Sequence, residues 1–215
     1  MRQRRMERPA AAAVALLALW ACSGPEAVDI SAAAANKKLT HDDYDSYLAR
    51  WTRSERVILL TELATSLRVH ATMMAPEFAV AYAARRAHVF KLPPGEERAL
   101  RERLLAQWGQ HYVFHVAAAA RDYKWNDFER EQSVWRVALV AGEREVEPAK
   151  VQAERAVTPT TRDLFPFVGA FHRAYWFRFP RELPDGTSLV GPDTRQLVLR
   201  FAGALGQADL TWQLR

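Results

Sequence analysis

Residues 111–116 read HYVFHV, and at this stretch the chain changes from a helical to a β pattern. Large apolar residues occupy every second position, as they do on the buried face of a strand. Four later segments, at 135–139, 175–179, 197–201 and 210–214, repeat this period of two, with turn residues between them. Several short alternating strands joined by turns predict an antiparallel β-sandwich, immunoglobulin-like in architecture. Pro148 lies in a further apolar segment and predicts an edge strand or irregular structure there.

On the N-terminal side of this stretch, residues 40–110 are expected to be mostly helical with one long strand. Thr40 is a suitable cap for a helix that places Tyr44, Leu48 and Trp51 on one face. Apolar residues alternate again over 57–74, which favours a long strand, although the first half of this segment could also be helical. Pro76 then suits the first turn of a helix, and a second helix is expected from about residue 96. The prediction is an α+β fold: a sandwich with a helical N-terminal arm and a two-helix insertion, forming one globular domain over 40–215.

The first 21 residues have the pattern of a secretory signal peptide. Four arginines lie within the first eight residues, and an apolar run follows from Ala10 to Ala21. This run is shorter than the roughly 20 residues with which a helix spans a bilayer. It ends in Leu19-Trp20-Ala21-Cys22, and Cys22 is the only cysteine of the chain.

These four residues resemble a lipobox, the motif of bacterial lipoproteins. The resemblance implies cleavage between Ala21 and Cys22 and acylation of Cys22, with palmitate among its acyl chains. Several acyl chains give a stable membrane anchor where one gives only a marginal one. Ser23 after the cysteine implies sorting to the outer membrane, where the body would face the periplasm. Residues 22–39 are small and polar, and we expect them to form a flexible tether.

The basic charge of the chain belongs mostly to this leader. Without residues 1–21 the formal net charge falls from +5 to +2. Nucleic-acid binding usually needs a clustered basic face, so we expect no nucleic-acid partner.

The sequence contains no local catalytic motif. It lacks a Gly-x-Ser-x-Gly elbow, a glycine-rich phosphate loop and a second cysteine. His111 and His115 have the spacing of helical metal ligands, but four residues along a strand span about 13 Å, too far for one zinc ion. We therefore expect no metal, no cofactor and no enzymatic activity.

Aromatic residues are the best candidates for a binding surface. Trp125 and Phe167 lie between predicted strands, where loops often carry binding residues. We favour the alternative that both plug the open ends of the sandwich. Trp176 lies within a segment that is apolar on both faces, so its side chain is expected to point away from the core toward a helix or a partner.

The favoured hypothesis is a non-catalytic, membrane-anchored envelope lipoprotein that binds an envelope protein or acts as a scaffold. Two alternatives stay open. One is a lipid-anchored hydrolase whose site is assembled from distant residues, and the other is a carrier of an apolar ligand. A cleft with a neighbouring histidine and carboxylate would favour the first, and an apolar cavity the second.

Overall fold

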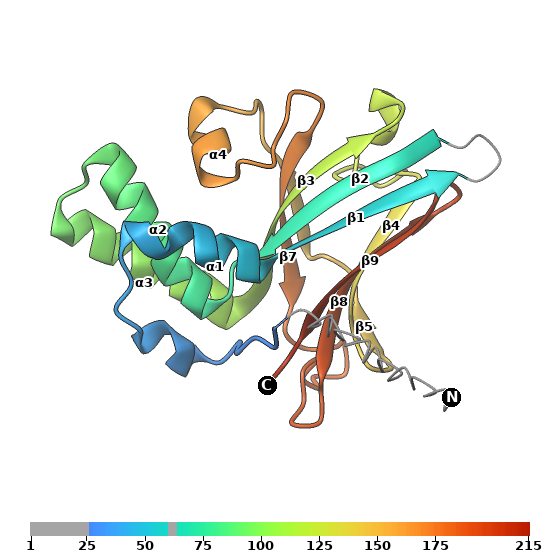
Figure 1. Cartoon of the computed structure of the whole chain (residues 1–215). Coiled ribbons are helices and arrows are strands. Elements are labelled where there is room, and N and C mark those ends of the chain that lie inside the picture. Colours follow the sequence, from blue (N-terminus) through green and yellow to red (C-terminus); the bar gives the residue numbers. More distant parts are fainter. Residues whose placement is uncertain (1–25, 60–63) are drawn as a thin grey trace, which may run out of the picture.

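The computed structural model describes residues 26–59 and 64–215. Cys22 and the expected signal peptide lie outside these residues. Two antiparallel sheets pack face to face, with helices gathered beside the larger one (Figure 1). The α+β sandwich predicted from the sequence is therefore confirmed.

The larger sheet has the order β1-β2-β3-β7-β6. Its strands are β1 (Thr52–Leu59), β2 (Ala64–Met73), β3 (His111–Ala120), β7 (Arg173–Pro180) and β6 (Lys150–Ala153). The smaller sheet has the order β5-β4-β8-β9. It consists of β5 (Arg144–Val146), β4 (Trp135–Ala141), β8 (Gln196–Gly203) and β9 (Gly206–Gln213). The segments around Pro148 thus form the two short edge strands β5 and β6.

The space between the sheets is filled by the alternating residues that the sequence pattern identified. Phe114 of β3 lies 5.7 Å from Phe179 and 5.4 Å from Trp212, ring centre to ring centre. Phe177 and Phe201 meet at 6.1 Å in an edge-to-face arrangement. All five rings are completely buried. Their close packing provides much of the hydrophobic stabilisation of the sandwich.

The helices precede and interrupt the strands of the larger sheet. Between β2 and β3 lie α2 (Pro76–Phe90) and α3 (Pro94–Gln110), the predicted two-helix insertion. The short helix η2 (His41–Asp43) leads into α1 (Tyr44–Trp51) of the N-terminal arm, and α4 (Pro159–Leu164) joins β6 to β7. Two further short helices are η1 (Ala32–Asn36) and η3 (Tyr123–Trp125). Among the described residues, no helix is both long and apolar enough to cross a membrane.

Two expectations for the first half of the chain need correction. The single long strand over 57–74 is two strands, because β1 pairs antiparallel with β2 from Thr52↔Thr72 to Leu59↔Ala64. The continuous apolar residues from Val57 hid the end of the first strand.

The expected tether is folded over most of its length. Val28 is buried and pairs with Leu214, and Ala34 is buried as well. Lys37 donates a hydrogen bond to the buried carboxylate of Glu77. Small residues are compatible with close packing as well as with flexibility, and here they pack against the body.

Candidate functional site

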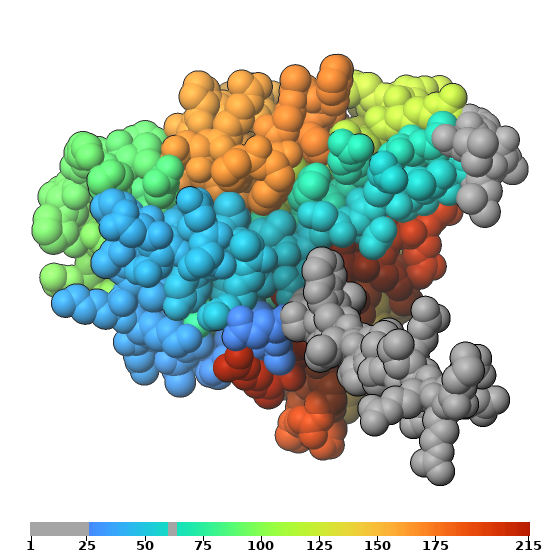
Figure 2. All heavy atoms as spheres, viewed as in Figure 1, coloured from blue at the N-terminus to red at the C-terminus, as the bar shows by residue number. Residues whose placement is uncertain are grey.

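A polar pocket of about 520 Å³ lies where β6 ends, β7 begins and α4 approaches the larger sheet. The loop after β3 closes its remaining side, so the pocket is assembled from segments far apart in the sequence. In Figure 2 the orange surface formed by α4 and the loop before β7 adjoins the yellow-green end of β3. The residues that line the pocket include Tyr123, Glu154, Arg155, Arg162, His172 and Arg173.

Three arginines give the pocket its positive character. Arg173 is already neutralised, since it donates to the carboxylate of Glu129 at 2.8 Å and to the carbonyl of Asn126. Arg155 and Arg162 are exposed, and neither makes an ion pair with any residue that the structure describes. The pocket lining therefore includes two arginines that form no ion pair among the described residues.

Two exposed aromatic residues belong to the pocket lining or adjoin it in the sequence. Tyr123, whose ring lies 5.8 Å from the guanidinium carbon of Arg173, is 69% exposed. Phe171 is 86% exposed and lies between two residues of the pocket lining, Ala170 and His172. Exposed large aromatic residues beside arginines are typical of protein-binding surfaces.

Glu154 lies in the lining of the pocket, but its carboxylate is engaged from within the molecule. The indole of Trp176 donates to Oε1 at 3.0 Å, and the hydroxyl of Thr161 donates to Oε2 at 3.1 Å. Nε2 of His115 lies 3.3 Å from Oε1. Burial opposes ionisation of Glu154, but these contacts together lower its pKa. Glu154 is thus a charged carboxylate held by hydrogen bonds from within the molecule, and it forms no ion pair with Arg155 or Arg162.

His115 is closed off from solvent beside this carboxylate. Its ring stacks on Phe165 at 3.7 Å and meets the edge of Trp176 at 4.9 Å. The residue is completely buried, and burial lowers its pKa despite the opposing effect of Glu154. A substrate cannot reach His115 without displacing the aromatic rings that cover it.

A second histidine group lies on the outer face of the larger sheet. His70 stacks on Phe167 at 5.1 Å and lies 5.4 Å from His172. Nδ1 of His70 is hydrogen-bonded to the hydroxyl of Ser54 at 2.6 Å. Burial, with smaller contributions from His172 and Arg68, lowers the pKa of His70 to about 4. Such a weak base is poorly suited to take a proton from serine near neutral pH.

The structure brings together two of the three aromatic residues singled out by the sequence. Phe167 and Trp176 both contact Phe165, at 5.9 and 6.4 Å, in the layer that α4 places over the larger sheet. Trp176 points away from the space between the sheets, toward Phe165 and Glu154. Both side chains are partly buried within the body, and the exposed aromatic residues beside them are Tyr123 and Phe171.

Trp125 lies apart from that pair. It lines a neighbouring crevice with Tyr123, and the ammonium nitrogen of Lys124 lies 4.7 Å from the centre of its ring. Because Tyr123 lines both hollows, Trp125 borders the same end of the molecule as the arginine pocket. Cys22 and Ala21 lie outside the described residues.

Sequence reasoning did not identify Tyr123, Phe171, Arg155 or Arg162. Phe171 follows Gly169-Ala170 between two strands, a loop context that could have drawn attention to it. The two arginines carry no local signal. Only the pairing of β6 with β7 and the placement of α4 bring them to one pocket.

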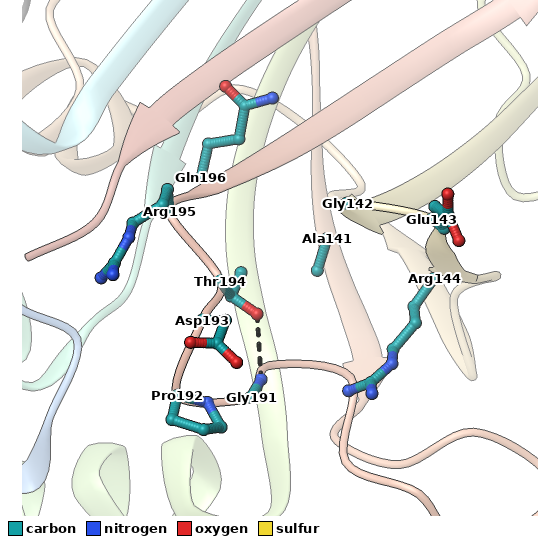
Figure 3. A pocket seen from close by; sticks show the side chains of 10 residues that line it. All are labelled: Ala141, Gly142, Glu143, Arg144, Gly191, Pro192, Asp193, Thr194, Arg195 and Gln196. Carbon is teal, nitrogen blue, oxygen red and sulfur yellow. Dashed lines mark hydrogen bonds between the residues drawn. The ribbon is translucent and has the colours of Figure 1, made fainter.

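A further hollow of about 540 Å³ lies between the β4–β5 turn and the loop before β8. Its side chains do not converge on a common point, since Glu143, Arg195 and Gln196 extend in different directions (Figure 3). The one hydrogen bond drawn there, from the amide of Gly191 to the hydroxyl of Thr194 at 2.9 Å, stabilises the loop itself. We therefore regard the arginine pocket as the stronger candidate.

Among the described residues, no group of three or more histidine, cysteine, aspartate or glutamate side chains is arranged to hold a metal ion.

Comparison with known proteins adds no relative to this picture. No family model matches the chain, and neither the curated proteins nor the solved structures yielded a match.

Proposed function

We propose that this chain is a lipid-anchored, non-catalytic binding module of the bacterial cell envelope that holds a protein partner at the arginine pocket. One observation carries the binding role. Exposed Tyr123 lines the pocket together with two arginines that lack an ion-pair partner among the described residues, and exposed Phe171 lies in the sequence between two residues of the lining. Exposed rings and unbalanced guanidinium groups both gain by being covered, and a protein interface covers both at once.

The membrane anchor rests on the Leu19–Cys22 motif of the sequence, with acylated Cys22 as the first residue of the mature chain. The folded body begins close to that cysteine, because Val28 already pairs with Leu214. The four residue steps from Cys22 to Glu26 span at most about 14 Å. The end of the body that carries Val28 would therefore lie near the bilayer, in our proposal the outer membrane seen from the periplasm.

The arginine pocket lies at the other end of the sandwich. Arg53, at the start of β1, donates to the carbonyl of Thr211 near the end of β9. The start of β1 and the end of β9 therefore lie at the same end of the sandwich as Val28, which pairs with Leu214. Arg173 pairs with Ala118 close to the end of β3, at the opposite end of the strands. In Figure 1 the C-terminus is at the bottom and α4 at the top. An anchor at Cys22 would thus present the pocket away from the membrane.

A hydrolase and a carrier of an apolar ligand have less support. The histidine that contacts a carboxylate, His115, is inaccessible, and the histidine that contacts a serine, His70, is a weak base. A carrier needs an apolar cavity, whereas the rings of Phe114, Phe177 and Phe201 fill the space between the sheets. These arguments favour binding over either alternative.

Site-specific cross-linking in living cells tests the proposal. Phe171 is replaced by the photoreactive residue p-benzoylphenylalanine, and Phe90 in a second strain serves as the matched control, because Phe90 is an exposed aromatic residue at the end of α2. We expect a cross-linked product of discrete mass from position 171 and not from position 90. Identical products from both positions, or none from position 171, would contradict the proposal.

A further inference from the structure

We propose that the arginine pocket binds an acidic segment of the partner, with a carboxylate between Arg155 and Arg162 and a neighbouring apolar side chain against Phe171 and Tyr123. This inference rests on the proposed function and specifies the chemistry of the ligand. The carboxylate would be an aspartate or glutamate side chain of the partner.

Two arginines without ion pairs come from separate segments of the chain to one pocket. Arg155 follows the end of β6, Arg162 lies in α4, and both line one hollow with Arg173. Like charges that line one hollow repel one another, and a bound anion relieves that repulsion. A carboxylate is suited to that place, because a guanidinium group can bind its two oxygens at once.

The chain supplies no such carboxylate of its own among the described residues. Glu154 is adjacent to Arg155 in the sequence, but its oxygens are occupied by Trp176 and Thr161 and approached by His115. The carboxylate of Glu129 is bound to Arg173. Arg68 adds positive charge near the pocket, since it lies close enough to lower the pKa of His172. With Arg173 balanced by Glu129, the lining keeps two arginines without an ion pair against the single carboxylate of Glu154, so an incoming anion meets a net positive charge.

The surroundings favour a protein segment over a lipid surface. The arginines line a concave pocket, which suits single side chains better than a flat layer of headgroups. The apolar contribution comes from the rings of Phe171 and Tyr123 at the rim, enough for one or two partner side chains. In addition, an anchor at Cys22 would leave the pocket at the end of the body remote from its own bilayer.

The experiment measures binding of two fluorescein-labelled peptides to the full chain, purified from membranes in detergent, by fluorescence anisotropy. The acidic probe is GSEDFESG, and the neutral probe GSQNFQSG has the same length and the same phenylalanine. The test variant is R155Q/R162Q. The matched control is R98Q/R101Q, which removes the same charge from two exposed arginines of α3.

We expect the acidic peptide to bind wild type and R98Q/R101Q equally, and R155Q/R162Q about tenfold or more weakly, because two charge-assisted contacts are lost. The neutral peptide should bind wild type as weakly as the acidic peptide binds R155Q/R162Q. Thermal unfolding of both variants checks that their fold is retained, as expected for exposed arginines without ion pairs.

Three results would overturn the inference. One is an acidic peptide that does not bind wild type, and another is equal binding to R155Q/R162Q. The third is that the protein binds vesicles of phosphatidylcholine and phosphatidylglycerol through Arg155 and Arg162 but does not bind the peptide. That result would assign the pocket to lipid. If position 171 still forms its cross-link in cells, the proposed function stands and only the ligand chemistry is wrong.

Discussion

Nε2 of His115 lies 3.3 Å from Oε1 of Glu154, inside a layer of aromatic rings that excludes water from the histidine. The pair connects the centre of the larger sheet, where His115 belongs to β3, to the short segment that leads into α4. Because Glu154 also accepts from Trp176 and Thr161, one carboxylate fixes the position of α4 over the sheet. Glu154 also lines the arginine pocket, so the pocket lies directly beside these contacts.

Mild acid should destabilise the protein through its histidines. His70, His115 and His172 all have pKa values lowered chiefly by burial, so the unfolded chain binds protons that the folded chain does not. These histidines therefore do not reduce the free energy of unfolding above pH 6.5, the ordinary pKa of histidine. Below it, the free energy of unfolding falls as the pH drops toward about 4, the pKa of His70. Urea unfolding at several pH values measures this slope.

The variant His70→Gln should flatten that slope between pH 6.5 and 5, a range above the usual pKa of carboxyl groups. His111→Gln is the control, because His111 is the first residue of β3 and is only partly buried. A stability that stays constant from pH 6.5 to 5 in wild type would contradict the burial of neutral histidines.

Glu77→Ala should destabilise the packing of the N-terminal arm on α2. The buried carboxylate of Glu77 accepts from the indole of Trp51 at 3.0 Å and lies against Lys37 and Arg50. Its removal leaves the buried indole N–H without its acceptor, so the free energy of unfolding should fall by about 2 kcal/mol. Glu96→Ala, an exposed change in the first turn of α3, should cost less than about 0.5 kcal/mol. Equal losses in the two variants would show that the contact with Trp51 contributes little.

Gly206→Ala should be costly because this glycine lies where the edge strands of the two sheets meet. Its φ is +119°, and an added Cβ would lie 2.4 Å from Cγ1 of Val57. We expect a loss of about 2–4 kcal/mol in chemical unfolding, from backbone strain and overpacking together. At Gly142, where φ is +64° and the space is open, alanine should cost about 1 kcal/mol. Adding Val57→Ala to Gly206→Ala should recover part of the loss, and no recovery would argue against the steric contact.

Cys22→Ala should release the protein from membranes or leave it as an unprocessed precursor. The reason is chemical, since the thiol of Cys22 is the group that would accept the lipid. Membrane fractionation and the intact mass of the protein are the measurements, with Ser23→Ala as the neighbouring control. An unchanged mass and unchanged fractionation of Cys22→Ala would refute the anchor.

The sandwich could be predicted because each of its central strands buries alternate residues on one face. Phe177 and Leu199 belong to such patterns, and both are completely buried between the sheets. The number of strands before α2 could not be predicted, because the apolar side chains from Val57 onward continue past the end of β1. A period of two does not show where one strand stops and the next begins.

The arginine pocket could not be predicted from local sequence patterns. Arg162 and Tyr123 are 39 positions apart in the sequence and line one hollow only because β3 pairs with β7 and α4 folds back over them. The aromatic residues Phe167 and Trp176 could be singled out, but their partial burial depends on His70 and His115, which are distant from them in the sequence. Tertiary contacts thus decide which rings stay exposed.

The pairing of Val28 with Leu214 brings the two ends of the described body together. Glu26 also forms an ion pair with Arg215 at 2.8 Å, so the ends are adjacent at the surface. A short peptide linker could join them, and a new start could be opened in the turn at Pro184-Asp185-Gly186 without breaking any strand. The fold should therefore tolerate circular permutation, and its strand pairing does not depend on the order in which the segments are synthesised.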